Sequence, residues 1–310
     1  MFAQFFTSIG ALLVGFFPLT FSAPIVAENP PLSPETREVS RATVLFAGDM
    51  MFDRFIRIKT EKRGGEFVFA CLDDTLERAD LVIANLEGPV TPFASISASS
   101  TVGTLANMTF TFPLTTADLL AQHNIRMVNL GNNHIRNFGT EGVRTTMSTL
   151  SDAGVGFFGS PLQSDAVYRH IEGVPVSFVS YNEFGGGRDV VLQQVVHARD
   201  GGFLPVVYTH WGDEYATTSA PRQRELAHAF VDAGAELVIG SHPHVIQEHE
   251  QYRGKYIYYS LGNFVFDQYW NDEVRTGLLL RITLTDRGVE RVDEIHTELQ
   301  PDGRTCLKTS

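Results

Sequence analysis

The stretch AELVIGSHPHV (Ala235–Val245) joins a short apolar run to two histidines separated by one proline. The apolar run has the length of a buried strand and is bounded by residues that favour turns. Hydrophobic packing alone does not explain why a buried strand would end in His-Pro-His. We therefore ask whether His242 and His244 are ligands, and whether other parts of the chain supply the rest of the same site.

The same pattern recurs along the chain, where a β-branched or aromatic run is followed abruptly by Gly, Asn, Asp or His. The further copies are ATVLFAGDMMFD (42–53), DLVIANLEGP (80–89), IRMVNLGNNHIRNFG (125–139), VSFVSYNEF (176–184), LPVVYTHWGDEY (204–215) and YIYYSLGNFVF (256–266). Helical patterns lie between several of these runs, for example at 140–154 and 216–235. This alternation predicts an α/β layered fold, in which ligands bind beyond the carboxyl ends of the strands.

The polar clusters at these strand ends contain oxygen and nitrogen groups of the kind that metal-dependent hydrolases use. They offer Asp49, Asn85, Glu87, Asn133, His134, His210, Asp213, Glu214, His242 and His244. Carboxylate, carboxamide and imidazole suit Mn, Fe, Ni or Zn, and the lack of a nearby Cys argues against a thiolate site. Each residue alone has an ordinary alternative as a turn residue or a core histidine. Turn chemistry does not explain four imidazoles at the ends of three apolar runs, so we expect one shared metal site.

The composition restricts the kind of partner. The chain has 310 residues, 24 Lys and Arg against 36 Asp and Glu, and a formal net charge of −12. Non-specific binding to nucleic acids or to anionic membranes needs a basic surface, so neither is expected of this chain. A long polyanion is also repelled unless a bound cation or local arginines reverse the field, which favours a small metal-centred site.

The first 27 residues carry no charged side chain and predict a signal peptide or an N-terminal anchor, followed by a linker over 28–40. We expect the folded domain at 41–300 and a C-terminal tail at 301–310. The location is then extracytoplasmic: secreted, periplasmic, or anchored in the membrane and facing outward. Cys71 and Cys306 permit one disulfide in an oxidising compartment, and the sequence leaves open whether they meet.

Six motifs carry a resemblance to a known family, in the order LFAGDMMFDR, ANLEGPVT, LGNNHIRNFG, YTHWGDEY, GSHPHV and YSLGNFVFDQ. They resemble the motif series of the CapA family, which is associated with capsule and poly-γ-glutamate synthesis. That family resembles the calcineurin-like metallophosphoesterases. The resemblance spans about Val44 to Arg281 and implies a two-sheet β-sandwich flanked by helices.

The resemblance also implies roles for individual residues. Its metal-ligand positions are matched by Asp49, Asn133, His210, His242 and His244. His134 resembles the histidine that protonates the leaving group. Two positions depart from the metallophosphoesterase pattern. Met51 stands where the first motif has a His, and NLEG replaces the second-motif Gly-Asp, so Glu87 is the candidate bridging ligand and Asn85 the alternative. The sequence leaves open whether one or two divalent metal ions bind.

Four further residues are candidates around this site. Asp213 or Glu214, close to His210, could orient its imidazole from outside the ligand set. Arg54 and Arg136 are candidates for contacting a phosphate or a polymer carboxylate.

Two functions are compatible with these features. The first is an extracytoplasmic, metal-dependent hydrolase of phosphoesters or of a cell-envelope polymer in capsule or poly-γ-glutamate biosynthesis. The second is a non-catalytic accessory protein for the synthesis, export or anchoring of an anionic surface polymer, with a membrane-bound polymer synthase as a possible partner. Met51 and the apolar leader favour the second, and the nearly complete ligand set favours the first.

Overall fold

The computed structural model describes residue 15 and residues 39–309. The predicted signal peptide or anchor, apart from residue 15, and residues 28–38 of the predicted linker lie outside the described residues. Within the described part of the chain, no helix is both long and apolar enough to cross a membrane.

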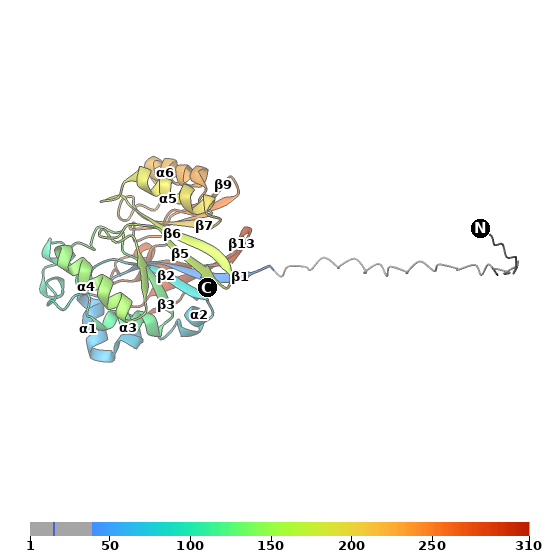
Figure 1. The fold of residues 1–310 in the computed structure, drawn as a ribbon. Coiled ribbons are helices and arrows are strands. Elements are labelled where there is room, and N and C mark those ends of the chain that lie inside the picture. The colour runs from blue at the N-terminus through green and yellow to red at the C-terminus, as the bar shows by residue number, and fades with distance from the viewer. Residues whose placement is uncertain (1–14, 16–38, 310) are drawn as a thin grey trace, which may run out of the picture. The chain divides into compact units, whose positions relative to one another are not determined.

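Two β-sheets face each other, and helices cover the outer face of each (Figure 1). The first sheet has eight strands, in the order β14-β13-β12-β1-β2-β3-β4, with β11 beside β1. Its strands are β1 (Arg41–Met50), β2 (Leu81–Leu86), β3 (Ile125–Asn129), β4 (Gly156–Phe158), β11 (Asn263–Val265), β12 (Thr276–Thr285), β13 (Gly288–Leu299) and β14 (Thr305–Leu307). The predicted fold class, two sheets flanked by helices, is confirmed.

The second sheet has six strands, in the order β5-β6-β7-β8-β10-β9. They are β5 (Val167–Ile171), β6 (Val174–Asn182), β7 (Leu204–His210), β8 (Leu237–Ser241), β9 (His249–Tyr252) and β10 (Lys255–Tyr258). The strands β6, β7, β8 and β10 are parallel, as are β1 to β4 in the first sheet. The carboxyl ends of each parallel set therefore lie along one edge of its sheet.

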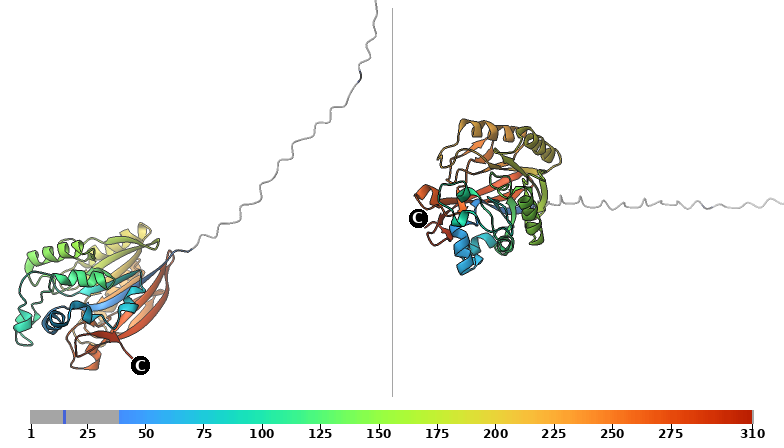
Figure 2. Two further views of the ribbon diagram at one scale, coloured as in Figure 1. Left: turned by 90° about the horizontal axis from the view of Figure 1, so that it is seen from below. Right: turned by 90° about the vertical axis from the view of Figure 1, so that its left-hand side faces the viewer.

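The helices divide between the two outer faces. They are α1 (Arg54–Arg63), α2 (Asp73–Glu77), α3 (Thr115–Gln122), α4 (Gly139–Asp152), α5 (Arg188–Asp200), α6 (Pro221–Ala233) and α7 (Asp272–Arg275). In Figures 1 and 2, α5 and α6 cover the second sheet, while α1, α3 and α4 lie on the far side of the first. The predicted helix at 216–235 corresponds to α6, which has Pro221 at its first position and ends before Gly234 in a left-handed conformation.

The alternation of side chains along β1 explains why both faces of its sheet are buried. Val44 and Phe46 pack into the core between the two sheets, together with residues such as Tyr208. Leu45 and Ala47 point the other way, into the core beneath the helices. Because successive side chains of a strand point to opposite faces, an almost continuous apolar run is what a doubly covered strand requires.

The C-terminal residues differ from the prediction of a tail at 301–310. Thr305–Leu307 form β14, which pairs with β13, and Cys306 forms a disulfide with Cys71. The chain reverses at Gly303, whose φ of 101° suits glycine. A three-residue strand has no hydrophobic period, so sequence reasoning had no signal for it.

The disulfide leads to a stability prediction. It closes a sequence separation of 235 residues, so it constrains most of the unfolded chain. Replacing Cys306 with Ser should lower the free energy of unfolding by about 2–5 kcal/mol, measured by denaturant titration under non-reducing conditions. The Cys71→Ser variant and the double variant should show the same loss. A wild-type protein that is insensitive to reductant and matches the variants would contradict the prediction.

Candidate metal centre

The candidate ligands come together because strand ends from both sheets meet. Asp49 near the end of β1 is in register with Asn85 on β2, and His210 at the end of β7 is in register with Ser241 on β8. The backbone N–H of His242 donates to Asp49 Oδ2 at 3.0 Å, which ties the end of the second sheet to that of the first. All five residues are buried.

The His-Pro-His turn has an unusual backbone. His242 has φ 97° and His244 has φ 59°, both in the left-handed region that non-glycine residues seldom adopt. Such conformations cost about 1–3 kcal/mol each and concentrate at functional sites. The turn brings both imidazoles to the junction of the sheets, where each is buried.

One group of possible metal ligands consists of Asp49, Glu87 and His244, whose ligand atoms all lie within 4.8 Å of one another. His244 Nδ1 is 3.5 Å from Asp49 Oδ2, and His244 Nε2 is 3.6 Å from Glu87 Oε1. Burial alone would raise the pKa of Asp49, but its contacts with His244 and the nearby His210 lower it to about 2. Asp49 is therefore an ionised ligand at neutral pH.

A second group consists of Glu87, His210 and His242, again within 4.8 Å. His210 Nε2 lies 3.1 Å from His242 Nδ1 and 2.9 Å from the side-chain oxygen of Asn133. Burial and the proximity of His242 hold the pKa of His210 well below its ordinary value. Burial and His244 lower the pKa of His242 to about 4. Neutral imidazoles have the free lone pair that a metal requires.

Glu87 belongs to both groups, as expected of a bridging ligand, and it provides the test of whether a cation fits. Both of its carboxylate oxygens are buried, and neither has a hydrogen-bond partner among the described residues. Burial, followed by repulsion from Asp49 and Glu214, raises the pKa of Glu87 well above its ordinary value. A buried carboxylate with no donor is costly unless a cation takes the place of the missing donors, so the residues present fit a divalent metal.

Asn85, the alternative bridging ligand, has a different place. Its amide nitrogen donates to Asp49 Oδ1 at 2.7 Å and contacts His210 Nδ1 at 3.2 Å. Its amide oxygen accepts hydrogen bonds from Asn129 and Asn132. With both ends of the carboxamide engaged, Asn85 orients two candidate ligands from beneath the site and is not free to bridge.

His134 lies beside Glu87, with Nε2 at 3.8 Å from Glu87 Oε1. Its Nδ1 contacts the Asn137 amide at 3.2 Å, and the ring of Phe110 packs against it at 4.4 Å between centroids. Burial, followed by repulsion from His244 and His242, lowers the pKa of His134 to about 3. The imidazole thus faces the candidate metal centre through one nitrogen and is held through the other.

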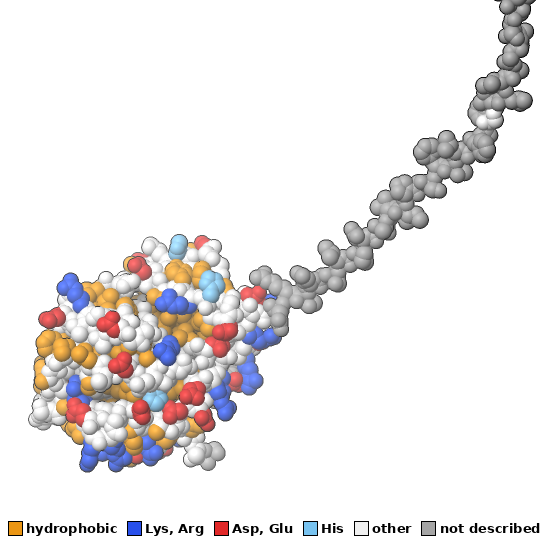
Figure 3. Space-filling view, turned by 60° about the horizontal axis from the view of Figure 1, so that its bottom comes forward, with side chains coloured by type: hydrophobic (Ala, Val, Ile, Leu, Met, Phe, Trp, Pro, Cys, Tyr) orange, Lys and Arg blue, Asp and Glu red, His pale blue; other side chains and the backbone are white. Residues whose placement is uncertain are grey.

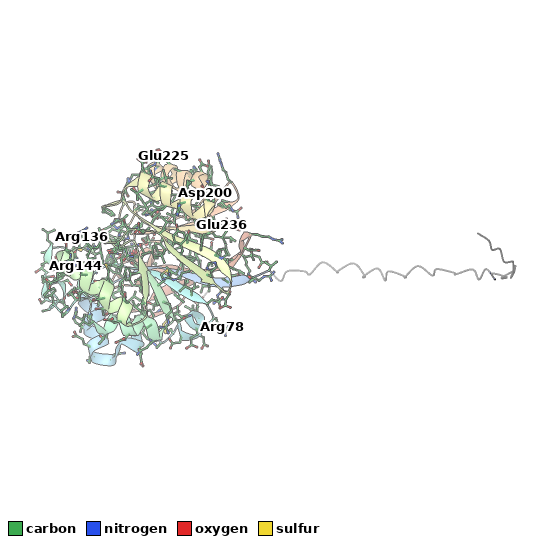
Figure 4. All side chains as sticks on the ribbon, viewed as in Figure 1. Arg78, Arg136, Arg144, Asp200, Glu225 and Glu236 are labelled. Carbon is green, nitrogen blue, oxygen red and sulfur yellow. A yellow bond between two sulfur atoms is a disulfide. The ribbon has the colours of Figure 1, made fainter. Side chains whose placement is uncertain are left out.

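The structure corrects the expectation for two of the outlying residues. Asp213 is exposed and bound to Arg222 at 2.8 Å, so it does not orient the His210 ring, whose Nδ1 contacts Asn85 and Ser241 instead. Arg136 is exposed at the periphery, where its guanidinium lies 3.5 Å from the Pro161 carbonyl (Figure 4). Neither residue belongs to the site.

Glu214 and Arg54 lie closer to it. Glu214 is exposed, and its charge contributes to the raised pKa of Glu87, but Asn85 and Ser241 take the role of orienting His210. Arg54 has a φ of 50° and forms an ion pair with Asp267. Its guanidinium lies over the rings of Phe110 and Phe266, at 5.0 and 5.5 Å.

Met51, which stands in place of a histidine ligand, is fully buried in the core beneath the helices. Its sulfur accepts the Asp53 N–H at 3.0 Å. This contact and its place in the apolar core give Met51 a packing role. The first group therefore has three ionisable ligands and no fourth imidazole at this position.

Sequence reasoning missed several residues that complete the site. Asn132 lies next to the predicted ligand Asn133 in the same motif, so its position in the sequence could have indicated that it belongs to the site. The side-chain oxygen of Asn263 lies 3.0 Å from His244 Nδ1, and Asn263 belongs to the LGNF motif, which also follows an apolar run. Phe184 packs its ring 4.6 Å from His242, and nothing in its sequence context predicted this contact.

A cavity of about 480 Å³ leads from the candidate ligands Glu87 and His244 to the surface. Glu87, His134 and His244 line its inner end, and Arg54 and Tyr215 line its wall. The cavity can take a small molecule or the end of a polymer.

Comparisons with known proteins place this geometry in context. The family model described as "Bacterial capsule synthesis protein PGA_cap" matches residues 43–268. The chain is 30% identical over 287 residues to the capsule biosynthesis protein CapA of Bacillus anthracis, covering 85% of this chain and 69% of that protein. It is 29% identical over 288 residues to the PGA biosynthesis protein CapA of Bacillus subtilis, with coverages of 86% and 73%.

More distant similarities are also found. A probable polyglutamine synthesis accessory protein of Mycobacterium tuberculosis is 30% identical over 194 residues, covering 51% of this chain and 50% of that protein. The crystal structure of the protein TT1561 of Thermus thermophilus aligns with a TM-score of 0.46 and 12% identity, covering 82% of this chain and 97% of that one.

Metal content tests the proposed ligands. Glu87→Gln should weaken the affinity for divalent metal by at least the roughly 10–100-fold that follows loss of an outer partner of a ligand, because it removes the negative charge shared by both groups. Elemental analysis of protein equilibrated with Mn, Fe, Ni or Zn provides the measurement. Asp213→Asn, an equivalent change at an exposed carboxylate, should leave the metal content unchanged. Unchanged content after joint replacement of His242 and His244 by Ala would refute the site.

The pH dependence of stability tests the environment of Glu87. Its pKa is raised in the folded protein above the ordinary 4.5, so the metal-free folded state holds a proton that the unfolded chain releases. The free energy of unfolding of the metal-free protein therefore decreases as the pH rises from about 4.5 towards the raised pKa of Glu87. Metal-free Glu87→Gln should therefore be more stable than wild type at pH 7, and the difference should shrink as pH falls to about 4.5. Thermal unfolding in chelator measures it, and a difference that does not change with pH would contradict it.

Proposed function

This chain belongs to the PGA_cap family of bacterial capsule synthesis proteins, and from that premise we propose that it is an extracytoplasmic, metal-dependent hydrolase. Its substrate is a phosphoester or an anionic cell-envelope polymer handled during capsule or poly-γ-glutamate biosynthesis. The relatives from both Bacillus species carry names that refer to capsule or PGA biosynthesis.

One observation carries the hydrolase proposal: the Glu87 carboxylate is buried without a donor among the described residues, it belongs to both groups of possible metal ligands, and it lines a cavity. A structural carboxylate would have hydrogen bonds or an arginine. Asp49, Glu87 and His244 would hold one metal ion, and Glu87, Asn133, His210 and His242 would hold another. A metal bound there supplies Lewis acidity and lowers the pKa of water.

The residues of the chain contribute orientation and proton transfer. Asn85 fixes Asp49 and His210 through one amide nitrogen. His134 would donate a proton to the leaving group from Nε2, the nitrogen that faces Glu87. Its pKa of about 3 keeps the ring neutral in the protein alone. The negative charge of a bound phosphoryl or carboxyl group would raise that pKa and so favour the protonated donor.

The covalent link between Cys71 and Cys306 supports the extracytoplasmic part of the proposal. Disulfides form and persist in oxidising compartments and are uncommon in the cytosol. The uncharged N-terminal 27 residues support the same location as a leader or an anchor.

A second candidate function is a non-catalytic accessory role in polymer synthesis, export or anchoring. Met51 favours it, because a buried thioether occupies the position of a histidine ligand. The Mycobacterium tuberculosis relative is itself named as a probable accessory protein. In this role the metal would stabilise the fold or bind an anionic group without hydrolysis.

The activity of a variant that lacks the His134 imidazole distinguishes between the two candidate functions. If the protein is a hydrolase, His134→Ala should lower kcat by about 10²–10⁴-fold while bound metal is unchanged. Steady-state hydrolysis of p-nitrophenyl phosphate and of γ-linked polyglutamate, with each of several metals, provides the measurement. His170→Ala, which removes an exposed imidazole, is the matched control. Metal-loaded wild type that cleaves neither substrate would favour the accessory role.

A further inference from the structure

The mouth of the site cavity is bordered by exposed apolar side chains. Ile58, Val102 and Trp270 all line the cavity, and they are 50%, 88% and 61% exposed. Leu105, three residues beyond Val102, is 89% exposed. Ile58, Val102 and Trp270 border one cavity, and Leu105 belongs to the same loop as Val102; we call these four residues the apolar rim. An exposed apolar cluster of this kind indicates a contact surface.

The loop that carries Val102 and Leu105 is also unusual in charge. No charged side chain occurs between Glu87 and Asp118, although 19% of the whole chain is charged. The middle of this segment contains only the short 3-10 helices at Ser97–Ser99 and Ala106–Met108. It protrudes at the left of the molecule in Figure 1 and in the left panel of Figure 2, drawn in teal. A contact made by this loop would desolvate no ionised group of its own.

The helix α1 adds positive charge beside the apolar rim. Lys62 lies four residues after Ile58 and so shares its face, and Lys59 lies over the ring of Phe55, another residue of the cavity wall. Lys62 is exposed, whereas Arg63 lies over the ring of Phe67, outside the cavity lining. The exposed Glu61 on the same helix is paired with Arg57 at 3.7 Å. Among the ion pairs of residues 39–309, none involves Lys59, Lys62 or Arg63. Figure 3 shows hydrophobic side chains at the left edge of one face and basic ones along its lower edge.

We propose that the apolar rim and α1 dock on the surface of a lipid bilayer that carries anionic headgroups, so that the cavity opens at the membrane surface. Protruding aliphatic side chains, a tryptophan and flanking lysines form the combination that partitions into the headgroup region. Lys59 and Lys62 of α1 provide the charge complementarity, at a place where the chain as a whole is acidic. A protein partner would call for a broad packed surface, whereas Val102 and Leu105 project almost free of neighbouring contacts.

Docking in this way has a consequence for the site. Glu87, His134 and His244 lie at the inner end of the cavity whose mouth carries Val102 and Trp270. A substrate or polymer end held at the membrane surface would then enter the cavity without first crossing bulk water. The docking itself does not depend on whether the site is catalytic.

The two tryptophans of the chain allow a direct test. Trp211 is 1% exposed, whereas Trp270 is 61% exposed, so only Trp270 reports on the rim. The full chain is mixed with vesicles of phosphatidylcholine and phosphatidylglycerol, with and without brominated acyl chains. Docking predicts a blue shift of the Trp270 emission and its quenching by brominated lipid. The Trp270→Phe variant should lose both signals, which identifies their source.

Variants then test the surface itself. Val102→Ser with Leu105→Ser should weaken the lipid titration of Trp270 quenching by about tenfold or more, because two aliphatic groups no longer partition. Lys59→Gln and Lys62→Gln together should weaken it on phosphatidylglycerol vesicles and remove its dependence on salt. Val190→Ser, at an apolar residue 51% exposed on α5, is the matched control and should change nothing.

Other results would overturn the proposal. If the chain sediments with vesicles while Trp270 stays unquenched, the N-terminal segment alone holds it and the rim does not dock. If the Val102 and Leu105 replacements titrate like Val190→Ser, the quenching does not arise from the rim. If Trp270 shifts only when a protein partner is added, the rim is a protein interface. Activity assays are not involved, so failure of the hydrolase proposal gives none of these results.

Discussion

A buried carboxylate without a hydrogen-bond donor is the feature on which this site depends. Glu87 follows β2 at the junction of two sheets, and neither of its oxygens has a partner within the described part of the chain. In isolation such a group is costly, and the protein keeps it by holding its pKa well above the ordinary value. A bound cation would remove this cost, because it would take the place of the missing donors. Glu87 is also the one residue that belongs to both groups of possible metal ligands.

The residues around Glu87 divide into those that orient the candidate ligands and those that carry charge. Carboxamides from Asn85, Asn129 and Asn132 form a linked layer beneath the candidate ligands. Through Asn85, this layer orients Asp49 and His210 without adding charge, and Asp49 is the ionised carboxylate of the metal-free site. Burial meanwhile holds the imidazoles of His210 and His242 neutral. This division of roles gives a divalent cation anionic and neutral ligands together, which is the set that hard and borderline metals prefer.

Local charge around the cavity differs from the net charge of the chain. The value of −12 predicts repulsion of anionic surfaces, yet the segment from Gly88 to Ala117 carries no charge, and α1 carries exposed cations. Arg54 lies in the cavity wall, where Asp267 and two aromatic rings hold it. Electrostatic arguments from composition therefore apply to the molecule at long range but not to the approach to this cavity.

The sequence by itself determined the α/β layers and the residue types at each strand end, because strand length, turn residues and side-chain period are local properties. It brought Asp49, Glu87, Asn133, His134, His210, His242 and His244 into one expected site, and the structure places all seven together. Only the tertiary structure decided which of them share Glu87, that Asn85 lies beneath the ligands, and that Asp213 and Arg136 lie outside. It alone joined Cys71 to Cys306 and gathered Ile58, Val102 and Trp270 at one mouth. Those outcomes depend on the register between strands and on contacts between distant segments, which no local pattern contains.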